Sequence, residues 1–180
     1  MSYDSIARRY ARAIFELGKE EGHAAELAEQ ITSFAEAYDD SEELKTVLEN
    51  PLVQEEARLA IVTEIAQRVG ATGTAQKAIR LITQRRRLRA LPAIARHLRR
   101  QVDEDAKVVR AHVTTASQPS ASYLETLKSE IEKSTGQKVI ITHSVDPSLI
   151  GGVVTAIGDR VVDGSIRSRL KSFRDGARPS

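Results

Sequence analysis

Histidine is the side chain of this sequence best suited to acid–base or metal chemistry, because its pKa lies near neutrality and its imidazole binds metals. The chain contains no cysteine that could serve instead. The four histidines are His23, His97, His112 and His143. None has a second histidine or a carboxylate at metal-ligand spacing on the same predicted element. We therefore expect surface or structural roles for them. The absence of cysteine excludes disulfides and metals held by thiolates.

A second group of candidates lies in the stretch DPSLIGGVVTAIGDRVVDGSIRSRLKSF, from Asp146 to Phe173. An aspartate here could act as a general base in a small enzyme, and the Gly-Gly pair could form an anion loop. The stretch contains no His, Cys or Glu, and the sequence has neither G-x-x-x-x-G-K nor G-x-G-x-x-G. We therefore expect the aspartates and glycines to shape turns and strand starts. These structural candidates are Asp146, Gly151, Gly152, Gly158, Asp159, Asp163 and Gly164.

Charge is distributed unevenly along the chain, although the net charge is only +2. The segment from Arg80 to Arg100 carries eight arginines and no acid, whereas Glu16 to Glu56 carries thirteen acids against two lysines. The basic segment is consistent with a solvated face, a protein-docking patch or a nucleic-acid surface. No aromatic residue is interleaved for base stacking. A nucleic-acid-binding module remains an alternative hypothesis, and it predicts binding that weakens steeply with salt.

Composition indicates a globular protein rich in helix. Of the 180 residues, 41% are hydrophobic and 29% are charged, with 4% aromatic and no Trp. Ala, Leu, Ile and Val must therefore build the core. The uncharged stretches are far shorter than the roughly 20 residues that span a bilayer. The N-terminus carries acids and lacks an apolar signal core, so we predict that it contains no secretory or transit peptide. We therefore expect the protein to reside in a reducing compartment.

Two domains are predicted from the periodicity, and the fold class is mainly α. Residues 1–105 form a six-helix bundle with short loops, because apolar residues recur at helical spacing and Gly22 and Asn50-Pro51 interrupt them. Residues 106–180 form a small α+β domain in the order βαβββα. Its predicted strands are 107–115, 139–145, 152–157 and 160–162, and its predicted helices are 119–134 and 165–173.

The first predicted helix, for which Asp4 or Ser5 can provide the N-cap, has an apolar sector wider than one core-facing stripe requires. Either the helix is buried on two sides, or its small-residue stripe is a docking groove for a partner helix. The fifth helix, from Ala75 to Ile82, has a similarly broad face. The two stripes of the first helix are Ile6, Tyr10, Ala13 and Leu17, and beside it Ala7, Ala11, Ile14 and Gly18.

Three segments together resemble a known family. They are YARAIFELGKEEG near the start, ALP after the RRRL run, and above all DPSLIGGVVTAIGDRVVDGSIRSRLKSF. The chain is similar over its whole length to the delta subunit of bacterial F-type ATP synthases, whose mitochondrial relative is the oligomycin-sensitivity-conferring subunit. The most specific features are the Gly-Gly step, the Gly-Asp turn and the Asp-Gly-Ser-x-Arg sequence. The residues of the weaker N-terminal match are Arg8, Tyr10, Ala11, Ala13 and Phe15.

The resemblance implies a non-catalytic stator subunit without cofactor or metal. Its N-terminal domain would hold the N-terminal helix of the alpha subunit between the first and fifth helices. Its C-terminal domain, with an apolar sheet and a basic last helix, would hold the C-terminal helices of the b subunits of the peripheral stalk. No nucleic acid is implied, and the protein would reach the cytoplasmic face of the bacterial membrane only through the complex. The candidates for the alpha-subunit contact are Tyr10, Ala13, Ile14, Ala78, Leu81 and Ile82.

Overall fold

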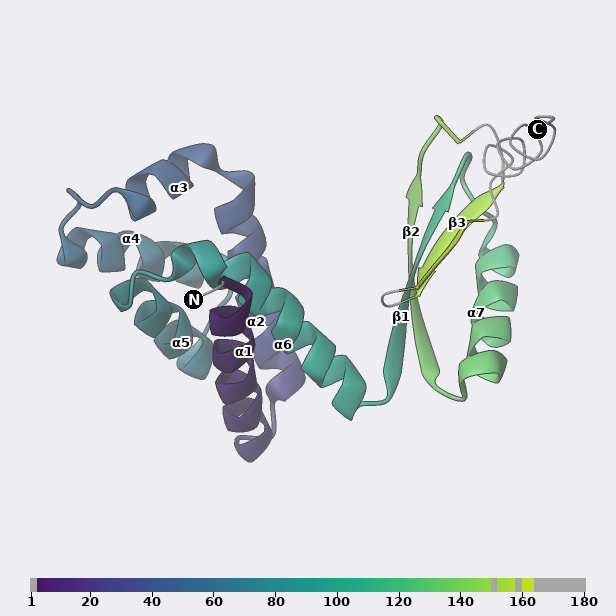
Figure 1. Ribbon diagram of the computed structural model, residues 1–180, viewed down its shortest axis with the longest axis horizontal. Coiled ribbons are helices and arrows are strands. Elements are labelled where there is room, and N and C mark those ends of the chain that lie inside the picture. Colours follow the sequence, from purple (N-terminus) through teal and green to yellow (C-terminus); the bar gives the residue numbers. More distant parts are fainter. Residues whose placement is uncertain (1–2, 150–151, 158–159, 164–180) are drawn as a thin grey trace, which may run out of the picture. The chain divides into compact units, whose positions relative to one another are not determined.

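The computed structural model describes residues 3–149, 152–157 and 160–163. The chain divides into two compact units, one up to Val102 and one from Asp103 onward, each with its own hydrophobic core. The first unit is helical, and the second combines a sheet with a helix (Figure 1). The mainly α fold class is therefore confirmed. The division falls inside α6, whereas the sequence pattern places it after residue 105.

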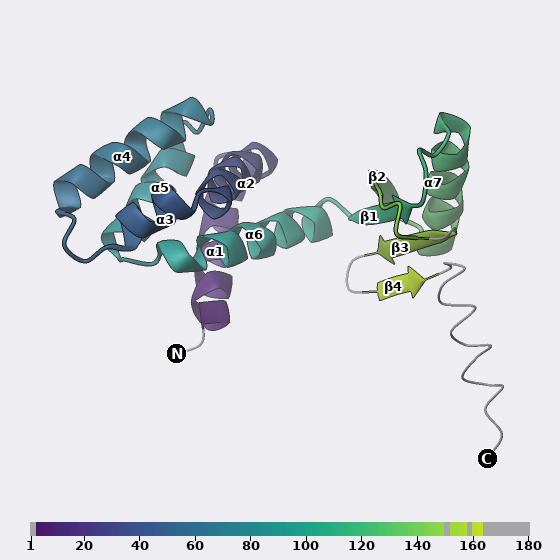
Figure 2. The same ribbon diagram turned by 90° about the horizontal axis from the view of Figure 1, so that it is seen from above.

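Helices joined by short connections make up the first unit (Figures 1 and 2). Each helix predicted from the periodicity is present, and a short 3-10 helix, η1, precedes the last one. The elements are α1 (Tyr3–Glu20), α2 (Ala24–Asp40), α3 (Glu42–Glu49), α4 (Glu55–Arg68), α5 (Gly73–Gln84), η1 (Leu88–Ala90) and α6 (Leu91–Asp105).

The start of α1 differs from the prediction. The helix already includes Asp4 in its first turn, so this residue does not provide the N-cap. Its carboxylate instead pairs with Arg8 one turn later, at 2.7 Å, and with Nε2 of His97 on α6, at 2.8 Å. The hydrogen bond from His97 and the charge of Arg8 lower the pKa of Asp4. The side chain thus ties the first turn of α1 to α6.

Helix α2 contributes the largest side chains of the helical core. Ile31 and Phe34 are completely buried, and Tyr38 is nearly so. They belong to one cluster with Ile79 of α5 and Leu98 of α6, which are also fully buried. Burying such a side chain contributes about 1.5–3 kcal/mol. The helices are therefore held mainly by packing, since most helical stability in proteins comes from tertiary contacts.

The small-residue stripe of α1 faces the protein interior. Ala7 and Ala11 are fully buried within the helical core. A Cβ atom placed on Gly18 would lie 2.8 Å from the Cα of Ala24 on α2, closer than real Cβ contacts allow. These small residues let α1 approach its neighbours closely. The hypothesis that this stripe is a docking groove therefore fails for Ala7, Ala11 and Gly18, and only Ile14 of the stripe lines a groove.

The second unit follows the predicted order through its fourth strand. Its strands form one sheet in the order β2-β1-β3-β4. The pair β1–β2 is parallel and the pairs β1–β3 and β3–β4 are antiparallel, so the chain crosses over between β1 and β2 through α7. The elements are β1 (Val108–Thr115), α7 (Ala121–Thr135), β2 (Lys138–Val145), β3 (Val153–Ile157) and β4 (Arg160–Asp163). The predicted last helix, 165–173, lies outside the described residues.

Cap residues set the ends of α7 as the sequence indicates. The Ser120 hydroxyl accepts a hydrogen bond from the amide of Tyr123, at 3.2 Å. Gly136 has φ of +67° and closes the helix, its amide donating to the carbonyl of Glu132 at 2.9 Å. Glycine adopts this left-handed conformation without the steric cost that a Cβ imposes.

The two faces of the sheet differ in character. One face packs apolar residues of β1 and β2, among them Ala111 and Val139, against Ile131 of α7. On the other face His112 makes hydrogen bonds to the hydroxyls of Thr142 at 3.0 Å and Ser144 at 2.9 Å. The expected apolar sheet is thus apolar where α7 covers it, while the opposite face is mainly polar and includes the exposed Ile140.

Candidate docking groove

An apolar groove lies between α1 and α5, with a volume of about 490 Å³. Leu17 is 41% exposed and Leu81 is 46% exposed, and because both line the groove they form part of one exposed apolar patch. Its lining residues come from three turns of α1, the residue after α1, and two turns of α5. They are Arg9, Tyr10, Ala13, Ile14, Leu17, Glu21, Thr74, Lys77, Ala78 and Leu81.

Helical spacing places these residues on facing surfaces. On α1 the residues Tyr10, Ala13 and Leu17 are separated by three and four positions, so their side chains lie along one face. On α5 the residues Ala78 and Leu81 are three positions apart. The alanines leave space between the bulkier lining side chains. An elongated apolar groove of this kind suits the apolar face of an amphipathic helix.

Charged side chains flank the apolar floor. Arg9 on α1 and Lys77 on α5 are exposed and basic, and Glu21 adds a carboxylate at the end of α1. Such flanking charges restrict which helices fit, since like charges on a partner are repelled.

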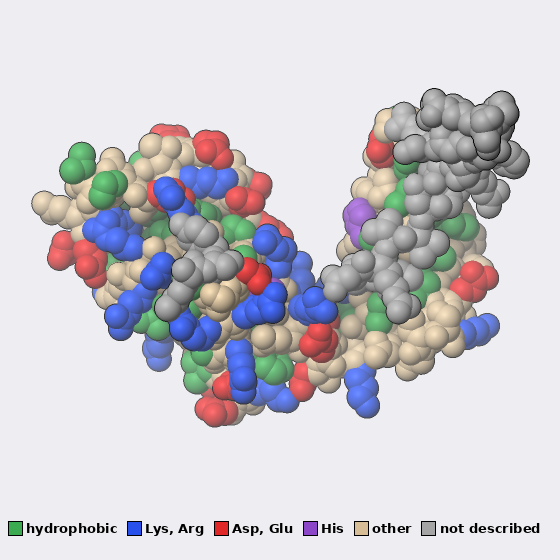
Figure 3. Space-filling model, in the orientation of Figure 1, with side chains coloured by type: hydrophobic (Ala, Val, Ile, Leu, Met, Phe, Trp, Pro, Cys, Tyr) green, Lys and Arg blue, Asp and Glu red, His purple; other side chains and the backbone are tan. Residues whose placement is uncertain are grey.

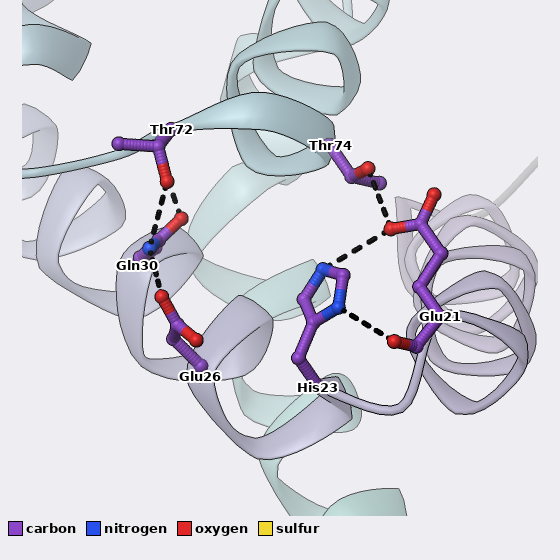
Figure 4. Close-up of polar contacts among 6 residues, drawn as sticks. All are labelled: Glu21, His23, Glu26, Gln30, Thr72 and Thr74. Atoms are coloured by element: carbon purple, nitrogen blue, oxygen red, sulfur yellow. Dashed lines mark hydrogen bonds and ion pairs between the residues drawn. The ribbon is translucent and has the colours of Figure 1, made fainter.

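A cluster of polar contacts joins the end of α1 to the start of α5 (Figure 4). The Thr74 hydroxyl donates to Oε2 of Glu21 at 2.7 Å. The same carboxylate oxygen lies 3.1 Å from Nε2 of His23, whose Nδ1 lies 3.1 Å from the Glu21 carbonyl oxygen. These contacts connect residues 53 positions apart in the sequence. They fix the separation of the two groove walls at this end.

Helix α2 supports the same junction from its own side. The amide of Thr72 donates to Oε1 of Gln30 at 3.1 Å, and Nε2 of Gln30 donates to the Thr72 hydroxyl at 3.3 Å. Nε2 of Gln30 also donates to Glu26 one turn earlier, at 3.0 Å. The start of α5 is thereby held against α2 as well as against the end of α1 (Figure 4).

Five of the six residues predicted to contact a partner helix line this groove. Ile82 does not, because its side chain is fully buried in the helical core. It lies one position beyond Leu81, and a step of one residue turns a helical side chain by about 100°. The other lining residues were not among the predicted contacts, and they are Arg9, Leu17, Glu21, Thr74 and Lys77. Leu17 lies on the same helical stripe as Tyr10 and Ala13, and this spacing could have identified it as a groove residue from the sequence.

The C-terminal motif residues that the structure describes lie in a turn or at or beside strand ends. The Asp146 carboxylate accepts a hydrogen bond from the amide of Ser148 at 2.9 Å, and its carbonyl accepts one from Leu149 at 3.0 Å. The Asp146 amide also donates to Thr115 at the end of β1. Gly152 has φ of +88°, and Asp163 ends β4. Gly151, Gly158, Asp159 and Gly164 lie outside the described residues.

The histidines form hydrogen bonds with neighbouring side chains or backbone groups. His97 pairs with Asp4, and Nε2 of His143 lies 3.2 Å from the side chain of Gln118. His23 and His112 have the partners given above. Among residues 3–149, 152–157 and 160–163, no group of three acidic, histidine or cysteine side chains could hold a metal ion. No helix in that same set is long and apolar enough to cross a membrane.

The basic segment is partly neutralised by the acidic one. Nε of Arg89 lies 2.7 Å from the carboxylate of Glu49 at the end of α3. Asp and Glu side chains lie among the Lys and Arg side chains on the face of the helical unit seen in Figure 3. On this face the basic side chains therefore do not form an unbroken track for a nucleic-acid backbone.

Comparison with known proteins gives a consistent result. A family model described as ATP synthase delta (OSCP) subunit matches residues 6–176. The ATP synthase subunit delta of Myxococcus xanthus is 40% identical over 172 residues, which cover 94% of each chain. That of Geotalea uraniireducens is 37% identical over 175 residues and 97% of each chain. A chain of the Toxoplasma gondii mitochondrial ATP synthase hexamer has the same fold, with a TM-score of 0.71 at 17% identity over 97% of this chain and 98% of that chain.

Proposed function

The chain belongs to the ATP synthase delta (OSCP) subunit family. We propose that its helical unit binds the N-terminal helix of the alpha subunit in the groove between α1 and α5. The protein is a non-catalytic stator subunit of the F-type ATP synthase. It links the catalytic head to the membrane sector and resists the torque of the rotor. Such a role requires firm, static contacts rather than reactive side chains.

The observation that carries the proposal is the exposed apolar floor of the groove. Leu17 and Leu81 are nearly half exposed in a unit whose other large apolar side chains are mostly buried. Covering the rest of each leucine with a partner helix contributes about 1 kcal/mol, roughly half of the value for complete burial. Several such contacts together offset the entropy lost on association.

The test is a titration of the full-length chain with a synthetic peptide that has the sequence of the alpha-subunit N-terminus from the same organism. We expect Leu17→Glu and Leu81→Glu to weaken peptide binding at least tenfold, because each places a charge in the apolar floor. Leu52→Glu is the matched control, since Leu52 is 88% exposed in the loop between α3 and α4. Equal weakening by all three variants, or no binding by the wild-type chain, would contradict the assignment.

For the second unit we propose docking of the C-terminal helices of the b subunits. Three large apolar side chains support this, because Tyr123, Ile140 and Val145 are 36–42% exposed. They lie on α7 and β2, within a unit that has its own core. A chain truncated to residues 1–105 should keep the alpha-subunit peptide and lose the stalk. Stalk binding by the truncated chain at full-length affinity would contradict this division of roles.

The proposed contacts also suggest where the protein is located. We propose that the protein reaches the cytoplasmic face of the bacterial membrane only through the complex. Washing membranes under conditions that release the catalytic head and stalk from the membrane sector should release this chain as well. Retention of the chain on membranes freed of the other subunits would contradict the proposal.

A further inference from the structure

A second cavity of the helical unit combines several arginines in a small volume. It measures about 200 Å³, and its lining residues do not overlap with those of the docking groove. It lies where the end of α3, the start of α4, the end of α5 and η1 meet. The lining residues are Leu48, Glu49, Arg58, Thr83, Arg86, Leu88 and Arg89.

Arg58 is the least expected of these residues because it is charged and only 2% exposed. One terminal nitrogen of its guanidinium donates to the carbonyls of Asn50, at 2.9 Å, and Val53, at 2.8 Å. These two bonds hold the loop between α3 and α4. The Nε–H is buried and has no hydrogen-bond partner among the described residues. A buried cationic donor of this kind is costly unless something accepts from it.

Arg86 lines the same cavity from an unusual backbone position. Its φ is +52°, the left-handed conformation that glycine usually provides at the end of a helix. Its amide donates to the carbonyl of Thr83 at 2.9 Å, and the amide of Arg87 donates to Ile82 at 3.0 Å. Arg86 is exposed, and it forms no ion pair within the described part of the chain. A long cationic side chain thus occupies a position where glycine costs less.

The one acidic residue of the cavity is already engaged. The Glu49 carboxylate accepts from the Tyr38 hydroxyl at 2.5 Å and from Nε of Arg89 at 2.7 Å. These two partners hold the pKa of Glu49 below its usual range. Three arginines therefore face one carboxylate in the cavity lining, which leaves an excess of positive charge.

We propose that this cavity binds a small free tetrahedral oxyanion of the inorganic phosphate class, which accepts hydrogen bonds from Arg58 and Arg86. Guanidinium groups match the geometry of phosphate oxygens and bind them through charge-assisted hydrogen bonds. A volume of about 200 Å³ has room for such an ion, since a single water needs only about 10–15 Å³. No aromatic residue lines the cavity, so a nucleobase would have no stacking surface there.

The test measures thermal unfolding of the full-length chain in phosphate and in chloride at equal ionic strength. A specific site raises the midpoint with increasing phosphate, because the ion binds only the folded state. Phosphate also stabilises proteins generally by exclusion from their surface, so a variant comparison is essential. In Arg86→Gly we expect the midpoint in chloride to be unchanged or higher, and the additional rise in phosphate to disappear. Arg85→Ala, the same charge change one residue earlier and outside the cavity lining, should keep the rise.

A second readout follows the proposed donor directly. The Nε–H resonance of Arg58 in a nitrogen–proton correlation spectrum should shift in a saturable way with phosphate in the wild type and not in Arg86→Gly. An equal phosphate effect on both proteins in both measurements would overturn the proposal and leave only general exclusion. No phosphate effect beyond that of chloride would overturn the proposal and indicate that the cavity holds water rather than an oxyanion. Binding to phosphatidylglycerol vesicles that depends on Arg86, without binding of free phosphate, would overturn it in favour of a lipid headgroup.

Discussion

Leu81 and Ile82 are adjacent on α5, and the structure assigns them opposite roles. Leu81 is 46% exposed in the docking groove, whereas Ile82 is fully buried. Leu81→Ala removes a side chain that completes its burial only when a partner helix binds. Ile82→Ala removes one that already fills the core. The pair therefore separates docking from folding at neighbouring positions.

The expected sizes follow from these environments. Leu81→Ala should cost about 1 kcal/mol of peptide affinity, or about fivefold in Kd, and about 1 kcal/mol of unfolding free energy from the half of the side chain that is already buried. Ile82→Ala leaves a core cavity and should cost about 2–5 kcal/mol of stability, which lowers the midpoint of thermal unfolding by at least about 8 °C. At a temperature where both variants are folded, Ile82→Ala should bind the peptide with affinity close to that of the wild type.

Calorimetric titration with the alpha-subunit peptide measures the first effect, and thermal unfolding followed by circular dichroism measures the second. Equal destabilisation by Leu81→Ala and Ile82→Ala would contradict this separation of roles. Weaker peptide binding by Ile82→Ala than by Leu81→Ala, with the chain still folded, would also contradict it. Either result would mean that the groove floor and the core are not separated along α5 as the exposures indicate.

Three further predictions concern stability. Gly18→Val should destabilise the helical unit by several kcal/mol in chemical denaturation, because even a Cβ would meet the Cα of Ala24 at 2.8 Å; unchanged stability would contradict the tight α1–α2 contact. The Tyr38 hydroxyl lowers the pKa of Glu49, so the ionised carboxylate stabilises the fold fully above the ordinary pKa of 4.5, and this stabilisation is lost as pH falls below that value. Glu49→Gln should therefore make the denaturation midpoint less dependent on pH in that range. An unaltered pH profile would refute this. Gly136→Ala should cost about 1 kcal/mol, from the left-handed backbone alone, since nothing lies within 4 Å of the added Cβ; a larger loss would reveal a steric contact.

Several features of this protein are local and can be read from the sequence. The helical period places Tyr10, Ala13 and Leu17 on one face of α1 because residues three and four apart share a face. Ser120 and Gly136 mark the ends of α7 because capping depends on the side chain and backbone freedom of single residues. The order of strands and helices follows for the same reason, and the family follows from motifs in the chain.

The tertiary structure decides which neighbour covers each face. Both stripes of α1 are apolar, but only packing against α2 shows that the one with Ala11 and Gly18 is interior. The bond between Glu21 and Thr74 joins residues 53 positions apart, and the position of β1 between β2 and β3 depends on pairing across the whole unit. The buried guanidinium of Arg58 likewise depends on where the loop after α3 folds back. Periodicity specifies which residues share a surface, whereas burial depends on contacts between segments that are distant in the sequence.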